Sequence, residues 1–182
     1  MQEIEERAEQ VLAAVPPYIW DGKRPPIPVE EIASSCYGLL VRDIEDLSVA
    51  PGSPKLEADE TLSGLLLTAR REIWVNAAEA REWPPRRRFT IGHELGHWVL
   101  HRDRADGAVF CRSNLVQPDE QPVGSEPDVP DIEEEASNFA AALLMPAELI
   151  RAEYARNRDF EHLCRTFNAS GAAMGRRLHA VI

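Results

Sequence analysis

Two histidines and a glutamate lie close together in residues 86–101, in the pattern HExxH that runs from His93 to His97. Histidines four residues apart on a helix project from the same side, with their Cβ atoms roughly 6 Å apart. Both rings can then bind one zinc ion at about 2.0–2.1 Å. Because the pattern also occurs by chance, it predicts either a zinc site or an ordinary buried helix that carries two histidines.

Glu94 directly follows the first histidine, about 100° further round the expected helix. A carboxylate at that position lies beside a metal ion without binding it. It can take a proton from water that the metal activates and pass the proton to a leaving amine. If a metal is bound here, we therefore expect Glu94 to be the general base of a hydrolytic reaction.

Two features of the stretch favour the metal site. Apolar side chains cover most of the circumference of the expected helix, where two imidazoles without partners would be costly. Gly96 stands in the middle of this helix, at a cost of about 1 kcal/mol relative to alanine. It leaves room for another backbone or a substrate to approach closely, although a glycine required only for packing explains it too.

A catalytic zinc ion usually has three protein ligands and one open position. In the longer spacing HExxHxxGxxH, the third ligand position is filled here by Asp103, and Leu100 replaces the glycine that lets the chain turn back. We therefore do not favour Asp103. His101 lies near the end of the helix, and we expect it either at the surface or behind one of the ligands.

A second acidic helix, beginning near residue 131, offers three consecutive glutamates. At about 100° per residue, Glu133 lies about 60° from the centre of the apolar face, Glu135 about 100° away, and Glu134 nearly opposite. An acidic first turn is also favoured by the helix dipole, which explains Glu134 and Glu135 better than Glu133. Glu133 is therefore the glutamate best placed to face inward as the third ligand.

Hydrophobic periodicity predicts an α+β fold. We expect helices over residues 3–15, 29–36, 86–100, 132–145, 147–157, 160–167 and 170–181, a strand from residue 39, and a β-hairpin over 62–69 and 72–76. A small antiparallel or mixed sheet would then pack on a helical half that carries the HExxH helix and the Glu133 helix. We expect a domain over residues 1–150 and a helical extension over 151–182 packed on it.

The last helices loosely resemble a helix-turn-helix, with Ser170 as the N-cap of the second helix. Arg176 and Arg177 could then contact phosphate. The formal net charge of −11 argues against direct binding to nucleic acid. We therefore expect these helices to complete the core and to present a docking surface.

Composition also indicates the cellular compartment of the protein. The first residues, MQEIEERAEQ, lack the apolar segment of a secretory signal, and no apolar run approaches the roughly 18 residues of a membrane span. The three cysteines are far apart, which favours a reducing compartment over a disulfide framework. We expect a cytoplasmic protein that does not enter a membrane, and the oligomeric state cannot be read from the sequence.

The stretches RFTIGHELGHWVLH and EEEASNFAAALLMP together resemble the ImmA/IrrE family of bacterial metallopeptidases, over roughly residues 28–150. VFCRS at 109–113 is also similar to a segment of that family. The resemblance implies a zincin-like fold of the gluzincin type, with His93, His97 and Glu133 as metal ligands and Glu94 as the catalytic residue. Ser137 stands where the family often has asparagine.

The resemblance implies a zinc endopeptidase that cleaves a helix-turn-helix repressor of the Xre type and so induces stress-response or mobile-element genes. Manganese could substitute for zinc. The alternative is a non-catalytic, metal-bound regulator that controls a repressor or a toxin–antitoxin-like partner by binding alone. An accessory DNA-binding protein is a third hypothesis, which the charge disfavours. Tyr154, Arg112 and His101 are candidates for stabilising the transition state.

Overall fold

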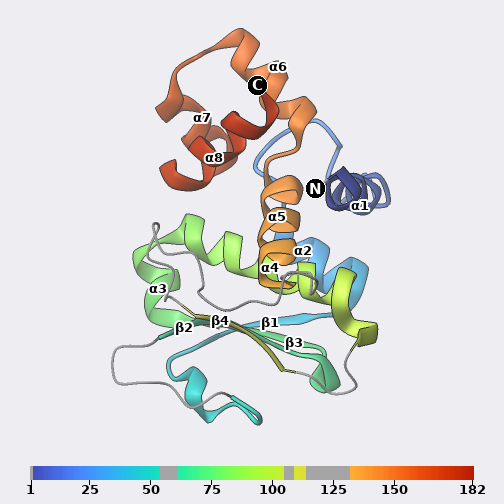
Figure 1. The fold of residues 1–182 in the computed structure, drawn as a ribbon, viewed down its shortest axis with the longest axis vertical. Helices are drawn as coiled ribbons and strands as arrows, with labels where there is room; N and C mark the ends of the chain where they lie inside the picture. The colour runs from blue at the N-terminus through green and yellow to red at the C-terminus, as the bar shows by residue number, and fades with distance from the viewer. Residues whose placement is uncertain (1, 54–60, 105–108, 114–131) are drawn as a thin grey trace, which may run out of the picture.

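The computed structural model describes residues 2–53, 61–104, 109–113 and 132–182 (Figure 1). Its mixed sheet and surrounding helices confirm the predicted α+β fold. The helices are α1 (Gln2–Ala13), α2 (Val29–Glu31, continued by a π-helical turn over Ile32–Cys36), α3 (Ala77–Glu82), α4 (Pro84–His101), α5 (Ile132–Leu144), α6 (Ala147–Arg156), α7 (Phe160–Phe167) and α8 (Gly171–Val181). The strands are β1 (Leu40–Ile44), β2 (Leu62–Leu67), β3 (Glu72–Asn76) and β4 (Val109–Ser113).

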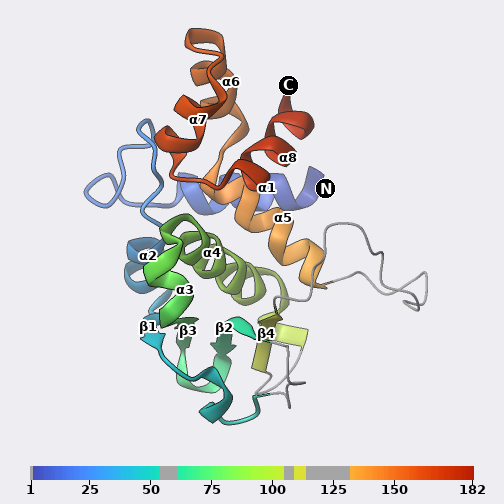
Figure 2. The same cartoon turned by 90° about the vertical axis from the view of Figure 1, so that its left-hand side faces the viewer.

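The elements are stacked along the long axis of the molecule. Figures 1 and 2 show the sheet at one end and helices α6, α7 and α8 at the other. Helix α4 lies across one face of the sheet, and α5 crosses α4 and leads away toward the C-terminal helices. Helix α1 packs against α5. The two helices that carry the chemistry predicted from the sequence therefore meet in the middle of the molecule.

The four described strands lie in the order β1-β3-β2-β4. The predicted hairpin is confirmed, because β2 and β3 pair antiparallel with Leu65 opposite Trp74. Its turn ends at Arg71, which adopts the left-handed conformation with φ 55°. Strand β1 pairs parallel to β3, and β4 pairs antiparallel to β2. Strand β4 therefore forms one edge of the sheet.

The two faces of the sheet bury different cores. Leu66, Ile73 and Val75 belong to the large core that the helices cover. Leu65 and Trp74 point the other way and pack with a small cluster beneath the sheet. This alternation is what β-strands covered on both faces require, and it explains why β2 is buried along its whole length.

Helix α3 was not predicted from the sequence. It begins at Asn76, whose side chain accepts hydrogen bonds from the backbone N–H groups of Ala78 and Glu79. Helix α4 then starts at Pro84, where a proline is tolerated because its missing N–H would have no helical partner. The two helices are thus separated only by Trp83, and the Pro84-Pro85 pair begins a helix rather than a loop.

The C-terminal helices join the rest of the molecule through a buried arginine. Arg177 on α8 is 7% exposed, and its guanidinium donates to the carbonyl oxygen of Met145 at 2.8 Å and to the carboxylate of Glu5 on α1. The suggestion that Arg177 contacts phosphate is therefore wrong for this structure, because its donors are already used inside the protein. Ser170 caps α8 as predicted, by accepting from the N–H of Ala173.

The division at residue 150 into a domain and an extension stays a prediction. In the described part of the chain, no helix combines the length and the apolar character that crossing a membrane requires.

Candidate metal centre

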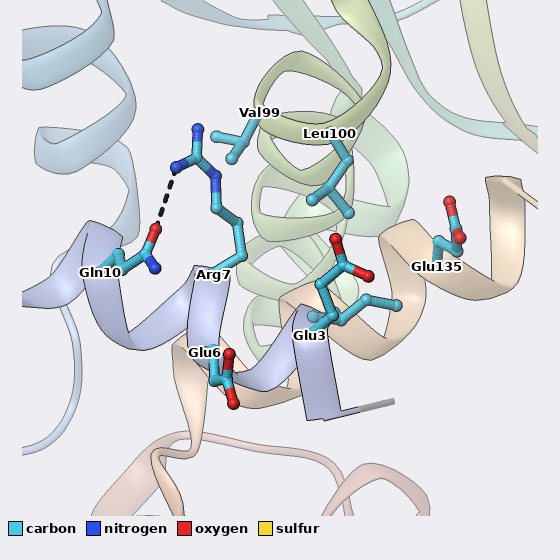
Figure 3. A pocket seen from close by; sticks show the side chains of 8 residues that line it. Glu3, Glu6, Arg7, Gln10, Val99, Leu100 and Glu135 are labelled. Carbon is cyan, nitrogen blue, oxygen red and sulfur yellow. Dashed lines mark hydrogen bonds between the residues drawn. The ribbon is translucent and has the colours of Figure 1, made fainter.

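A surface pocket of about 540 Å³ lies between α1 and the neighbouring parts of α4 and α5 (Figure 3). Glu3, Glu6, Arg7 and Gln10 line it from α1, with Val99 and Leu100 from α4 and Glu135 from α5. Arg7 already donates to Gln10 at 3.1 Å. The polar groups of this pocket do not converge on one point, and neither histidine of the HExxH pattern lines it. The two histidines of the pattern therefore lie on another side of α4.

The position of the site is set by a close crossing of α4 and α5. A Cβ atom on Gly92 would lie 3.3 Å from the Cβ of Ala140, and one on Gly96 would lie 3.1 Å from the carbonyl oxygen of Ala136. Two glycines one turn apart on α4 thus face two alanines one turn apart on α5. The room that Gly96 leaves is filled by the backbone of α5, so its role in this structure is packing rather than access for a substrate.

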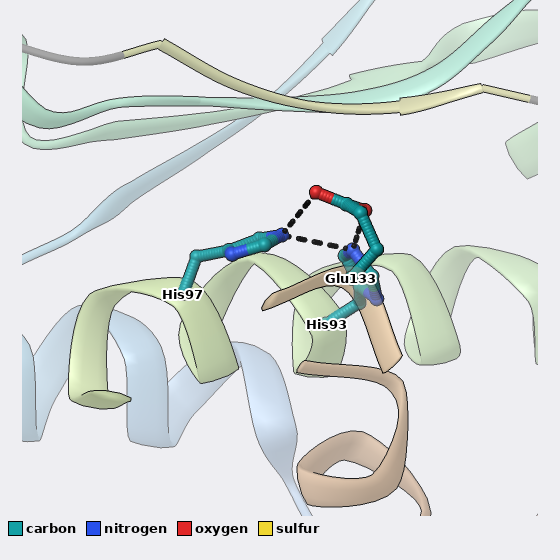
Figure 4. A group of neighbouring side chains, drawn as sticks. All are labelled: His93, His97 and Glu133. Atoms are coloured by element: carbon teal, nitrogen blue, oxygen red, sulfur yellow. Dashed lines mark hydrogen bonds and ion pairs between the residues drawn. The ribbon is translucent and has the colours of Figure 1, made fainter. Parts of the chain in front are cut away.

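This crossing brings together three of the residues singled out in the sequence. His93 and His97 on α4 and Glu133 on α5 each offer one ligand atom, and these atoms all lie within 4.8 Å of one another. His93 Nε2 is 3.0 Å from Glu133 Oε2, and His97 Nε2 is 3.1 Å from Glu133 Oε1. Figure 4 shows the three polar ends meeting on the side of α4 that faces the sheet. The group could hold a metal ion.

The donor set and its spacing fit zinc. Two imidazole nitrogens and a carboxylate oxygen are the ligands of one common class of catalytic zinc site. At bond lengths of 2.0–2.1 Å in a tetrahedron, ligand atoms stand about 3.3 Å apart. The two histidine Nε2 atoms are 3.1 Å apart here. A shift of a few tenths of an ångström would therefore give the spacing that zinc requires.

Glu133 is ready to act as an anionic ligand. Burial raises the pKa of its carboxyl, but the hydrogen bonds and the charges of His93 and His97 outweigh burial and hold that pKa at about 2. Its side chain is 45% exposed, whereas those of the two histidines are at most 2% exposed. The cluster is thus closed on the side of α4 and open on the side of Glu133.

Glu94 is completely buried, and it lies under strand β2. A Cβ atom on Gly64 of β2 would stand 3.2 Å from Glu94 Oε1 and only 2.3 Å from the Cγ2 atom of Thr90. Glycine is therefore required at position 64 if the strand is to pass this closely over α4. Glu94 points toward the sheet, the side on which Figure 4 places the three ligand atoms.

Three further contacts lie behind His93 and His97. His97 Nδ1 is 3.1 Å from Nδ1 of His101, and His101 Nε2 is 2.8 Å from Glu135 Oε2. His93 Nδ1 is 3.2 Å from the hydroxyl of Ser137. Of the two expectations for His101, a place at the surface is wrong, since it is 1% exposed, and the structure places it directly behind His97. The four-residue spacing from His97 to His101 was the available signal.

Asp103, Tyr154 and Arg112 are the remaining candidates. The side chain of Asp103 is 94% exposed and stands beside Arg102. Tyr154 lies on α6, with the guanidinium of Arg158 over its ring at 5.6 Å. The side chain of Arg112 lies outside the described residues. No group that could stabilise a transition state is therefore assigned.

A comparison with family models matches residues 53–179 to the IrrE N-terminal-like domain, a peptidase family. None of the curated proteins with which the chain was compared matches it. The matched residues include α4, α5 and the whole three-residue cluster.

Proposed function

Because the chain belongs to the IrrE N-terminal-like, or ImmA/IrrE, family of metallopeptidases, we propose that it is a zinc-dependent endopeptidase. In this proposal His93, His97 and Glu133 bind the metal, and Glu94 is the general base. The observation that carries the proposal is the convergence of three ligand atoms, supplied by two helices, within 4.8 Å. Manganese could replace zinc at these ligands.

The chemistry follows from the donor set and from the buried carboxylate. When bound, zinc supplies a Lewis acid that lowers the pKa of water toward 7 and polarises a carbonyl group. Glu94 takes a proton from the water that attacks the peptide carbonyl carbon. It later gives this proton to the amine nitrogen as the carbon–nitrogen bond breaks. Its burial beneath β2 keeps the carboxylate away from bulk water, where a proton would exchange with solvent.

The edge strand supports an extended peptide as the substrate. Strand β4 pairs with β2 on one side only, so in the described part of the chain its other edge can accept backbone hydrogen bonds from an added strand. Such pairing recognises backbone rather than a particular sequence. It favours a flexible linker or loop, because a helix would have to unfold before it could pair.

We propose a helix-turn-helix repressor of the Xre type as the substrate, as the resemblance implies, with stress-response or mobile-element genes induced by its cleavage. The charge of the chain supports such a partner, because −11 at neutral pH attracts the basic surface of a DNA-binding domain.

The test compares the wild type with Glu94→Gln on the repressor encoded nearest to this protein in the genome. We expect the zinc-loaded wild type to generate one new N-terminus in the repressor, detected by mass spectrometry. Glu94→Gln should keep one equivalent of zinc and lose at least about a hundredfold in cleavage rate. Glu134→Gln, which changes an exposed carboxylate on α5, is the matched control and should cleave normally.

Cleavage by Glu94→Gln at the wild-type rate would overturn the proposed mechanism. Tight binding of the repressor by a zinc-loaded wild type that never cuts it would instead favour a regulator that acts by binding.

A further inference from the structure

We infer that α5 carries two positioning groups that hold the histidines in the tautomer required for metal binding. Glu135 acts on His97 through His101, and Ser137 acts directly on His93. The inference rests on the proposed function, since it needs His93 and His97 to be metal ligands. It goes further by assigning roles to three residues that touch neither metal nor substrate.

The longer of two hydrogen-bond chains runs from Glu135 through His101 to His97. Glu135 Oε2 lies 2.8 Å from His101 Nε2, and His101 Nδ1 lies 3.1 Å from His97 Nδ1. Both histidine side chains are at most 1% exposed, whereas that of Glu135 is 28% exposed. Water cannot replace these contacts at the two rings, so each ring nitrogen depends on the partner that the protein supplies.

One requirement determines which nitrogen of each ring carries the proton. A metal needs the lone pair of His97 Nε2, so the proton of that neutral ring must be on Nδ1. His97 Nδ1 then donates to His101 Nδ1, which must be unprotonated. The proton of His101 is consequently on Nε2, where it is donated to the carboxylate of Glu135. Only this arrangement satisfies both contacts while leaving His97 Nε2 available.

The shorter hydrogen-bond chain, from Ser137 to His93, constrains the tautomer of His93 in the same way. His93 Nε2 faces Glu133, and His93 Nδ1 lies 3.2 Å from the hydroxyl oxygen of Ser137. With Nε2 reserved for the metal, Nδ1 donates and the hydroxyl accepts. A hydroxyl is a weaker acceptor than a carboxylate, so Ser137 should contribute less than Glu135.

The first six residues of α5 therefore have three roles. Glu133 supplies a metal ligand, Glu135 ends the hydrogen-bond chain to His97, and Ser137 is the partner of His93. The close crossing at Gly96 and Ala136 fixes the segment against α4. Residues that orient ligating histidines in this way typically contribute about 10- to 100-fold to metal affinity.

The competing explanation is that the Glu135–His101 contact only stabilises the packing of α4 against α5. The two explanations differ in what they predict for metal affinity. We would measure zinc affinity by competition with a chromogenic chelator, and the melting temperature of the metal-free protein, for Glu135→Ala, Glu135→Gln, Ser137→Ala and Ser137→Thr. Glu134→Ala changes an exposed neighbour on the same helix and is the control.

We expect Glu135→Ala to weaken zinc binding about 10- to 100-fold, and Glu135→Gln to recover most of the loss because its amide oxygen still accepts. Ser137→Ala should weaken binding by less, with recovery in Ser137→Thr, and Glu134→Ala should not change it. Unchanged affinity in Glu135→Ala with a lowered melting temperature would overturn the inference in favour of packing alone.

A spectroscopic test needs no variant. In zinc-loaded wild type labelled with ¹⁵N-histidine, long-range proton–nitrogen correlations should show His101 protonated on Nε2 and not on Nδ1. A proton on Nδ1 of His101 would overturn the inference. Failure of the proposed function looks different, because wild type would then bind no zinc, or His97→Ala would bind zinc as tightly as wild type.

Discussion

Helices α4 and α8 both bury polar side chains, and both contain a glycine in mid-helix, yet the two helices use these features differently. His93, Glu94 and His97 are buried on α4, and Arg177 is buried on α8. The ring nitrogens of His93 and His97 on α4 and the carboxylate of Glu133 converge on one point, where they face one another at 3.0–3.1 Å. The guanidinium of Arg177 is instead paired with acceptors on either side.

The difference shows which kind of burial indicates a site. Arg177 gives its donors to the Met145 carbonyl and to Glu5, so the arrangement is complete within the protein. In the cluster on α4, two imidazole nitrogens and two carboxylate oxygens lie close together. Such a group could hold a metal ion, whereas the donors of Arg177 already have acceptors within the protein.

The glycines differ in the same way. A Cβ atom on Gly96 would lie 3.1 Å from both the Ala136 carbonyl oxygen and the ring of Phe139, whereas one on Gly175 of α8 would meet nothing within 4 Å. The first glycine is required by the neighbouring helix. The second has no such requirement.

Removal of a ligand is the change with the largest expected effect. His97→Ala should weaken zinc binding at least about 1000-fold, equivalent to about 4 kcal/mol, because one of three protein ligands is lost. Arg177→Ala should leave zinc affinity unchanged, as measured by chelator competition. A comparable loss of zinc affinity in both variants would mean that the ion pair on α8 also supports the metal site on α4.

The second prediction concerns the free energy of unfolding. Arg177→Ala should lower it by about 3 kcal/mol, the lower end of the range for a broken buried ion pair, because Glu5 keeps some access to water. The control is Arg176→Ala, an exposed neighbour, which should change stability by less than about 0.5 kcal/mol. Urea unfolding of both variants measures the difference, and equal stabilities would contradict it.

Alanine in place of each glycine should give effects of opposite sign. Gly96→Ala should destabilise the protein by about 2 kcal/mol, because α5 must move away from the added methyl group. Gly175→Ala should stabilise it by up to about 1 kcal/mol through the better helix propensity of alanine. Thermal unfolding of the metal-free variants tests this, and a stabilising Gly96→Ala would show that the crossing is not tight.

The smallest expected effect concerns how the two helices begin. Helix α8 has a side-chain cap from Ser170, whereas α4 begins at Pro84 without one. Ser170→Ala should therefore cost about 1 kcal/mol of stability, and Ser170→Asp should preserve it because aspartate also caps. Loss of stability in the aspartate variant equal to that in the alanine variant would argue against the cap.

Much of this architecture follows from local sequence patterns. The helical period predicts α4, selects Glu133 over Glu134, and places most helix ends within two residues of those observed, because each depends on neighbours along the chain. The parallel pairing of β1 with β3 depends on distant segments, and no local pattern encodes it. The convergence of Glu133 with the two histidines has a local part, the direction of the side chain, and a distant part, the crossing angle of the helices.

The residues that were misjudged or left open share one cause. The sequence left His101 either at the surface or behind a ligand, because it lies near the end of α4, and the contact with Glu135 of α5 goes with its burial. A phosphate contact was suggested for Arg177 because the last helices loosely resemble a helix-turn-helix, but Glu5, 172 positions away in the sequence, provides its counter-charge. Whether a polar side chain is buried or exposed depends on its partner on a remote element, and a single sequence does not reveal that partner.

The ion pair between Glu5 and Arg177 also bears on the order of events in folding. It links the first helix to the last, so it can form only after the chain between them is arranged, and its loop-closure entropy is high. Contacts of this kind are usually absent from the folding transition state. Arg177→Ala should therefore speed unfolding while leaving the refolding rate nearly unchanged, so that the pair prolongs the lifetime of the folded protein rather than hastening its formation.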